Sequence, residues 1–160
     1  MNTQPIAPSL RAILAEMLDG PAAGGYLLNA NDPGIIRSLD RLSAQAASAT
    51  HAGGASIAAH VDHLRYSFSL MNRWAAGENP YADADWTVSW RKNVVSDAEW
   101  AELRADFARG ARRWLDTIGT PREVSDQELT SLIGNLAHLA YHIGAIRQID
   151  RSTRGPAATD

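Results

Sequence analysis

Cysteine is absent from all 160 residues of the sequence. This excludes disulfide bonds, thiolate metal ligands and cysteine nucleophiles, so any thiol chemistry needs a thiol supplied by another molecule. No apolar run reaches the roughly 20 residues that a membrane-spanning helix requires. The opening residues MNTQPIAPSL also lack the basic and apolar regions of a secretory signal peptide. We therefore expect a cytoplasmic protein with no membrane partner.

A strong charge of either sign is missing too. The 15 Lys and Arg residues against 18 Asp and Glu residues give a net charge of −3. This disfavours nucleic acid as a partner, because proteins that bind it usually carry a basic stripe. A hydrophobic content of 45% with 21% charged residues is typical of a folded globular chain. The length suits one domain, which we place at residues 1–151, followed by a disordered tail over residues 152–160.

Alanine is abundant, with 28 residues, and it has the highest helix propensity. Apolar residues recur at steps of three and four, which is the helical period. The predicted helices cover residues 8–18, a short segment that begins at Asp32 and Pro33 and extends to Leu42, and residues 56–76, 97–118 and 126–151. Residues 48–54 read as a loop. The fold class is all-α, most simply a four-helix bundle with short extra N-terminal helices and a long crossover loop.

Two of the long helices have matching start signals. Ser96 with Glu99, and Ser125 with Glu128, have the spacing of a capping box. In this motif the serine and the glutamate each accept a hydrogen bond from the other's backbone N–H.

The connection over residues 78–95 is unusually long for a compact domain. It contains Trp86 and Trp90, whose large apolar rings are costly to leave in water. We expect these rings to pack down as a lid or as part of the crossover. The segment WTVSW could instead form a short strand, although the sequence offers that strand no partner.

Histidines form the main candidate site. His138 and His142 are four residues apart and project from one helix face, while His60 and His63 lie close together on another helix. A bundle that aligns these helices can bring a third imidazole to an ion held by the first pair. Three histidines with an open position are typical of a catalytic metal site.

Two metal-site classes are disfavoured by missing glutamates. The segment HLAYH lacks the glutamate of the HExxH protease motif, and neither histidine-bearing helix has the Glu-x-x-His pair of di-iron bundles. The alternative is a set of core histidines that only form hydrogen bonds. From the spacing alone, both interpretations stay open.

The segments ASIAAHVDHLRYS and NLAHLAYHIGAIRQI resemble the two signature helices of the DinB/YfiT-like superfamily. The turn at residues 31–34, before IIRSLDRLSAQAAS, is similar as well. The resemblance implies a four-helix bundle that binds one divalent metal through His63, His138 and His142. Helical geometry leaves a competing choice, because His60 lies about 50° and His63 about 110° from the apolar stripe of their helix. His60 is therefore kept as an alternative ligand, or as a residue behind the ligands.

The resemblance also implies a bacterial homodimer with a small-molecule substrate and one Zn, Ni or Fe ion per chain. The leading function is a metal-dependent enzyme, either a low-molecular-weight thiol S-transferase or a small-substrate hydrolase. The alternatives are a non-catalytic metal-binding stress-response module and a metal-free interaction protein. Besides His60, residues expected to orient a ligand or to contact substrate are Asp62, Tyr66, Tyr141 and Arg147, with Arg65, Gln148 and Asp150 as further candidates.

Overall fold

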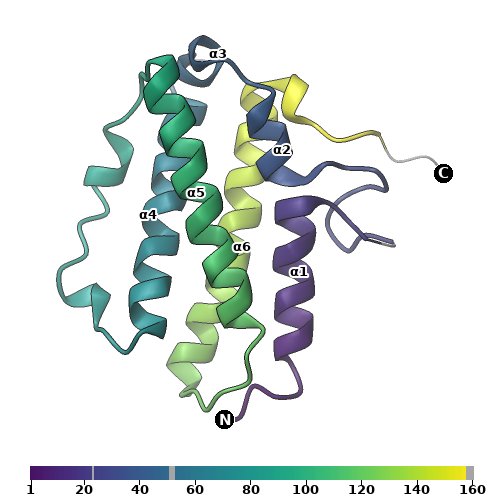
Figure 1. The fold of residues 1–160 in the computed structure, drawn as a ribbon, viewed down its shortest axis with the longest axis vertical. Coiled ribbons are helices and arrows are strands. Elements are labelled where there is room, and N and C mark those ends of the chain that lie inside the picture. The colour runs from purple at the N-terminus through teal and green to yellow at the C-terminus, as the bar shows by residue number, and fades with distance from the viewer. Residues whose placement is uncertain (23, 51–52, 158–160) are drawn as a thin grey trace.

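The computed structural model describes residues 1–22, 24–50 and 53–157 and confirms the all-α fold class (Figure 1). These residues form six α-helices and three short 3-10 helices, and no strand. The α-helices are α1 (Ala7–Asp19), α2 (Gly34–Asp40), α3 (Ala44–Ser48), α4 (Ile57–Ala75), α5 (Asp97–Ile118) and α6 (Asp126–Ile149). The 3-10 helices are η1 (Pro80–Ala82), η2 (Val88–Trp90) and η3 (Arg151–Thr153). None of the described helices is long and apolar enough to cross a membrane.

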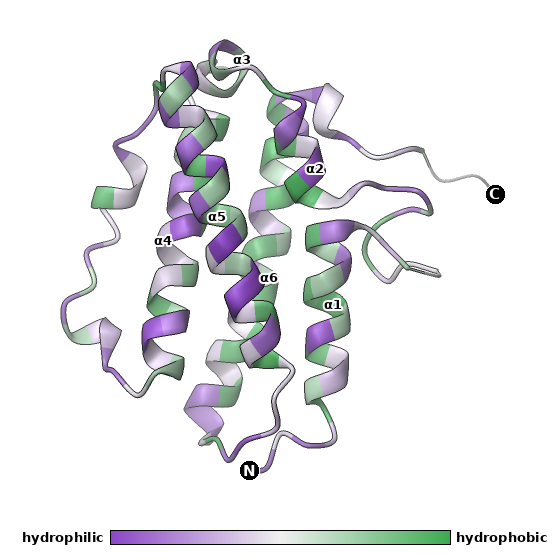
Figure 2. Ribbon diagram, viewed as in Figure 1, coloured by the Kyte–Doolittle hydropathy of each residue, from purple (hydrophilic) through white to green (hydrophobic). Residues whose placement is uncertain are grey.

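Four long helices, α1, α4, α5 and α6, lie side by side, as a four-helix bundle requires (Figure 1). Their inward residues form one core in which Phe68 of α4 packs against Phe107 of α5, with 5.9 Å between ring centroids. Figure 2 shows hydrophilic and hydrophobic residues alternating along α5. This alternation is what the predicted apolar spacing produces.

Both predicted capping boxes are present. Ser96 accepts from the backbone N–H of Glu99 and Ser125 from that of Glu128, and each glutamate accepts from its serine's N–H in return. These contacts satisfy backbone donors that have no partner inside a helix, and they fix where α5 and α6 begin.

The segment predicted as one short helix from Asp32 to Leu42 differs in the structure. α2 ends at Asp40, and α3 begins after Ser43, whose hydroxyl accepts from the backbone N–H of Ala46 at 3.1 Å. A serine that caps a new helix competes with continuation of the old one. Ser48 belongs to α3, so the predicted loop begins one residue later, and residues 51–52 of it lie outside the described part of the chain.

Two further segments differ from expectation. WTVSW forms no strand; its last three residues form η2, and the one isolated β-bridge of the described chain joins Asn2 and Glu123. The tail expected to be disordered from residue 152 instead contains part of η3, whose Thr153 is buried and donates to the backbone oxygen of Asp150. Residues 158–160 lie outside the described chain.

Candidate metal centre

α4 and α6 run antiparallel, and polar side chains meet across them in a regular register. As residue numbers rise along α4, the numbers of their partners fall along α6. The cross-helix contacts are His60 Nδ1 to His142 Nδ1 at 2.8 Å, His63 Nε2 to His138 Nε2 at 3.0 Å, and Asn135 Nδ2 to Ser67 Oγ at 3.3 Å. All four helical histidines therefore lie at one level of the bundle.

Three of these histidines, His63, His138 and His142, each offer one ring nitrogen within 4.8 Å of the other two. The Nε2 atom of His138 lies 3.0 Å from Nε2 of His63 and 3.0 Å from Nε2 of His142. Two nitrogens bound to one ion at about 2.0–2.1 Å are separated by about 2.9–3.4 Å. The spacing of the imidazoles therefore fits a shared transition-metal ion.

The electrostatic surroundings keep the imidazoles neutral. Burial, followed by the nearby imidazoles of His138 and His60, lowers the pKa of His63 to about 4. Burial and the other three histidines lower the pKa of His142 to about 3. Burial also lowers the pKa values of His60 and His138. Neutral imidazole is the form that binds metals, because protonation occupies the lone pair.

The two tryptophans of the crossover loop pack against the histidines, although Trp86 stays 40% exposed. The Trp90 ring stacks on His63 with 4.3 Å between centroids and 25° between planes. Trp86 lies 5.5 Å from His63 and 6.5 Å from the half-buried His138. The indole rings of the loop therefore cover one side of the histidine cluster.

Ser89 is a contact residue that sequence reasoning missed. Its side chain is buried in η2, and its hydroxyl lies 2.9 Å from Nδ1 of His63. A single serine in a non-periodic loop carries no sequence signal of this role, because the contact depends on where the loop folds back.

His60 and His63 take different places. His63 contributes its Nε2 atom to the three-histidine group, whereas His60 lies behind His142 and meets its Nδ1 atom. When His142 donates its Nδ1–H to His60, the Nε2 atom of His142 carries no proton. That Nε2 atom is the one that lies beside His138. This is the arrangement expected of a residue that orients a metal ligand.

Two tyrosines lie beside the site, whereas the predicted carboxylate of Asp62 is hydrogen-bonded to a residue outside it. The Tyr66 hydroxyl accepts from the backbone N–H of Asp85 at 2.9 Å and thereby holds the crossover loop. Tyr141 is 71% exposed, with its ring 5.1 Å from His142. The Asp62 carboxylate accepts from the Arg65 guanidinium at 2.9 Å and from no described histidine.

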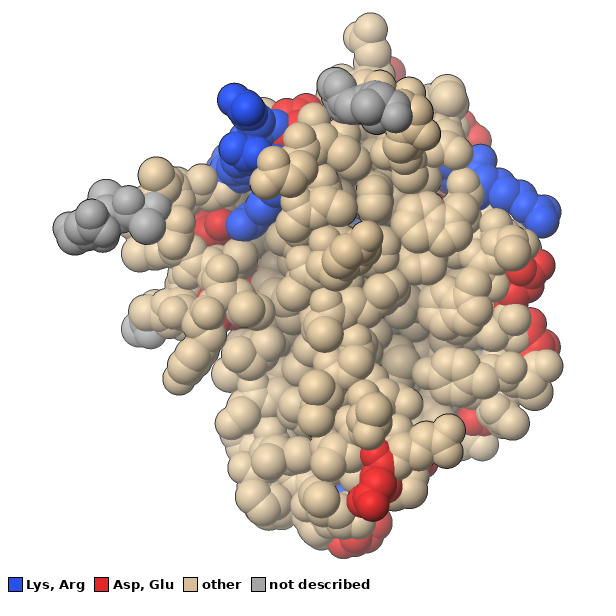
Figure 3. Space-filling model, turned by 180° about the vertical axis from the view of Figure 1, so that it is seen from behind, with Lys and Arg blue, Asp and Glu red and all other residues tan. Residues whose placement is uncertain are grey.

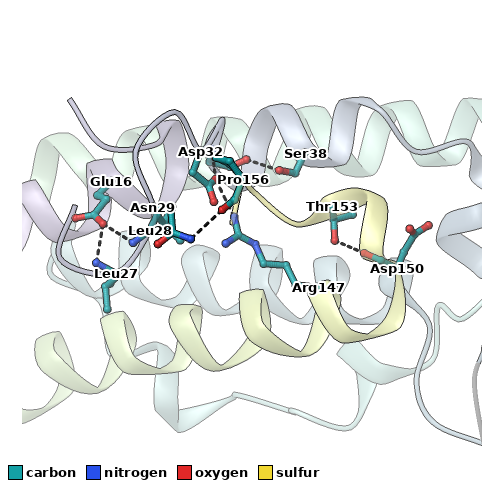
Figure 4. Close-up of polar contacts among 11 residues, drawn as sticks. Glu16, Leu27, Leu28, Asn29, Asp32, Ser38, Arg147, Asp150, Thr153 and Pro156 are labelled. Atoms are coloured by element: carbon teal, nitrogen blue, oxygen red, sulfur yellow. Dashed lines mark hydrogen bonds and ion pairs between the residues drawn. The ribbon is translucent and has the colours of Figure 1, made fainter. Parts of the chain in front are cut away.

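Arg147 lies away from the histidine cluster, in a network that ties α6 to the N-terminal half (Figure 4). Its guanidinium donates to Asp32 Oδ1 at 2.9 Å. Further along, Gln148 accepts from Arg154, and the Asp150 side chain accepts from the backbone N–H of Ser152. The structure therefore brings none of the three α6 residues Arg147, Gln148 and Asp150 to the imidazoles.

The exposed side of α6 carries no charge. Between Glu128 and Arg147 the sequence has no Asp, Glu, Lys or Arg. Figure 3, which views the molecule from behind Figure 1, shows a broad face free of charged residues, with Lys, Arg, Asp and Glu gathered at its rim. Ile133 and Tyr141 are exposed on α6, and the Tyr141 ring lies 5.1 Å from that of His142.

Comparison with known proteins supports the helical fold class. The family model of the DinB superfamily matches residues 35–146, a span that contains α4, α5 and the three clustered histidines. No curated protein and no solved structure matches the chain significantly. Because the family model covers well over half of the sequence, the chain belongs to the DinB superfamily.

Proposed function

We propose that the protein binds one divalent transition-metal ion per chain through His63, His138 and His142 and acts as a metal-dependent enzyme. The observation that carries this proposal is the convergence of three neutral imidazoles, whose Nε2 atoms are spaced as the ligands of one ion are. Zinc, nickel and iron all accept such a nitrogen donor set.

The proposed reactions are transfer of a low-molecular-weight thiol and hydrolysis of a small substrate. A divalent ion at this site would supply Lewis acidity to a thiol or to a carbonyl group. The chain has no cysteine, so a thiol must come from a cosubstrate. The indoles of Trp86 and Trp90 over the imidazoles favour thiol transfer, because they limit the access of competing water.

A non-catalytic metal-binding module is the second candidate. This candidate is supported by the position of a cavity of about 540 Å³ beside the crossover loop. The cavity is lined by residues such as Arg65, Arg91 and Glu99, and the histidines do not line it. An enzyme would therefore have to admit its substrate past Trp86 or along the exposed side of α6. Activity assays with thiol cosubstrates separate the two candidates, since only an enzyme loses turnover when the ion is removed.

The first experiment measures the metal content of protein made without a polyhistidine tag and purified without chelators. We expect about one first-row metal ion per wild-type chain, and loss of that ion in His63→Ala and His142→Ala. His60→Ala is the matched control, because it removes a buried imidazole at the same level that is not a proposed ligand. We expect it to keep a stoichiometry near one with weaker affinity.

Two results would contradict this proposal. A wild-type protein that neither contains metal nor takes up added Zn²⁺ or Ni²⁺ would leave a bundle with hydrogen-bonded core histidines. Loss of the ion in His60→Ala but not in His63→Ala would replace His63 with His60 in the ligand set.

We also propose a homodimer formed through the charge-free side of α6. An uncharged face does not repel its own copy, and a two-fold axis places the same patch on both subunits. The exposed ring of Tyr141 and the exposed aliphatic side chain of Ile133 would be buried in such a contact. Because the face adjoins His142, the dimer would enclose the open side of the cluster.

A further inference from the structure

We propose that Ser89 is a positioning residue that couples metal affinity at the three-histidine site to the seating of the crossover loop. This inference rests on the proposed metal-binding function and names a residue outside the ligand set. It follows from the direction of two hydrogen bonds and from the way in which the loop is held.

The hydroxyl of Ser89 has a single proton and two contacts. It lies 2.9 Å from the backbone oxygen of Trp86 and 2.9 Å from Nδ1 of His63. A carbonyl oxygen only accepts, so the hydroxyl donates its proton to Trp86. The contact with His63 must then run the other way, with Nδ1–H of His63 donating to the serine oxygen.

This direction fixes the tautomer of His63. A neutral imidazole has one N–H, so a proton on Nδ1 leaves Nε2 with a bare lone pair. That Nε2 atom is the one 3.0 Å from Nε2 of His138. Ser89 therefore holds His63 in the ring form and orientation that a metal ligand needs, as partners of metal-binding histidines generally do.

Ser89 lies in the crossover loop, so its position depends on how that loop is held against α4 and α3. On one side the loop is held by the Asp85 N–H, which donates to Tyr66 at 2.9 Å. On the other side the Val95 N–H donates to the Ser48 hydroxyl at 3.0 Å. If the loop lifts, His63 loses both the acceptor for Nδ1–H and the stacked Trp90 ring. Metal binding must in turn stabilise the seated loop, because such coupling is reciprocal.

The test compares Zn²⁺ affinity, by competition with a chromogenic chelator, in wild type, Ser89→Ala, Ser89→Thr and Ser38→Ala. Ser38 is the matched control, since it is equally buried and donates to a backbone oxygen, that of Gly34, far from the histidines. We expect Ser89→Ala to weaken Zn²⁺ binding about 10–100-fold, the usual range for loss of such a partner. Ser89→Thr restores the hydroxyl and should recover most of the affinity, and Ser38→Ala should bind as wild type does.

Two further measurements separate positioning from general loss of structure. In the metal-free wild type, the imidazole ¹⁵N resonances of His63 should report a proton on Nδ1, and in Ser89→Ala that preference should weaken. Tryptic cleavage after Arg91 and Lys92, followed by mass spectrometry, reports the state of the loop. Added Zn²⁺ should slow this cleavage several-fold in wild type and much less in Ser89→Ala.

Equal Zn²⁺ affinity in wild type and Ser89→Ala would overturn the inference, and so would an Nε2–H tautomer of His63 in the wild type. A similar loss of affinity in Ser38→Ala would also overturn it, by showing that any lost hydroxyl has this effect. These results differ from failure of the proposed function, in which the wild-type protein itself binds no metal.

Discussion

Arg147 Nη2 lies 2.9 Å from Asp32 Oδ1, and the Asp32 side chain is only 1% exposed. The same oxygen also accepts from the backbone N–H of Gly34 at 2.9 Å. This buried ion pair joins the end of α6, just over one turn after His142, to the start of α2 (Figure 4). Arg147, which the sequence offered as a candidate to orient a ligand or to contact substrate, therefore holds two parts of the fold together.

Replacing Asp32 with asparagine should destabilise the fold without removing the metal ligands. The change keeps an oxygen for Gly34 but leaves the Arg147 charge buried without its counter-ion, which costs about 3–5 kcal/mol. Urea unfolding measures the loss, and metal content should stay at the wild-type value. Asp83→Ala is the control, since it removes an exposed partner of Arg73 and should change stability much less. Equal effects of the two substitutions would argue against the buried pair.

Glu16 is expected to make stability depend on pH. Burial acts to raise its pKa, but hydrogen bonds from the backbone N–H groups of Tyr26, Leu27 and Leu28 lower it, and the net pKa lies below the usual value near 4.5. Gly25 is required in this turn, because a Cβ there would lie 1.9 Å from the oxygen of Leu28. The carboxylate therefore organises residues 25–28 beside α1.

Because the folded-state pKa of Glu16 is depressed, its contribution to stability is complete above the unfolded pKa and is lost as pH falls through the folded one. Glu16→Gln should cost about 1–3 kcal/mol at neutral pH. The difference in unfolding free energy from wild type should shrink as pH falls from about 6 to 3. Chemical denaturation across this pH range measures it, and a difference that does not vary with pH would contradict the assignment.

Trp90 should act as an optical reporter of the metal. Its ring stacks on His63 at 4.3 Å, so a paramagnetic Ni²⁺ ion bound by the histidines should quench its fluorescence. Trp90→Phe should remove part of the quenching seen on titration, and the rest should come from Trp86, whose ring lies 5.5 Å from that of His63. Trp74→Phe, a change near Trp114 at the far end of α4, should leave the quenching intact. Unchanged quenching in Trp90→Phe would place the bound ion away from this ring.

Gly144→Arg tests the dimer proposed for the charge-free side of α6. A Cβ at Gly144 meets no atom within 4 Å, so the monomer has room for the new side chain. Two arginines brought together at a two-fold interface would repel and dissociate the dimer. Light scattering coupled to gel filtration should show a dimer for wild type and a monomer for the variant. A dimeric variant, or a monomeric wild type, would rule out this interface.

Metal binding should stabilise the native fold, because the three ligands come together only in the folded chain. At a free Zn²⁺ concentration of about 100 times Kd, the gain is about 2.7 kcal/mol. Thermal unfolding with Zn²⁺ and then with excess chelator measures it, and His142→Ala should show no shift. A shift of equal size in that variant would indicate binding elsewhere.

Local patterns in the sequence predicted much of the fold. Apolar periodicity located the long helices, and the Ser-x-x-Glu spacing located the starts of α5 and α6, because these signals act within a few residues. Helix α3 was not predicted, because five residues after the Ser43 cap are too few to show an apolar period. The contacts of residues 152–157 were not predicted, because they involve distant partners such as Asn29, which donates to the oxygen of Pro156.

For the candidate site, the sequence supplied the histidines but not their arrangement. Helical angles left His60 and His63 as competing choices; in the structure His63 belongs to the three-histidine group, and His60 contacts Nδ1 of His142. Ser89 could not be predicted, since its contact with His63 arises from the path of an irregular loop. The guanidinium group of Arg147 is able to bind an anionic substrate, but in the structure it donates to Asp32 of the same chain.

The antiparallel register of α4 and α6 would determine at which stage of synthesis the proposed ion could be bound. His63 and His138 are 75 positions apart, so the ribosome must make the whole of α5 between the two ligands. Only His138 and His142 can act together early, as neighbours on one helical turn, and such a pair holds an ion weakly. Tight binding of the proposed ion would therefore follow the packing of α6 against α4.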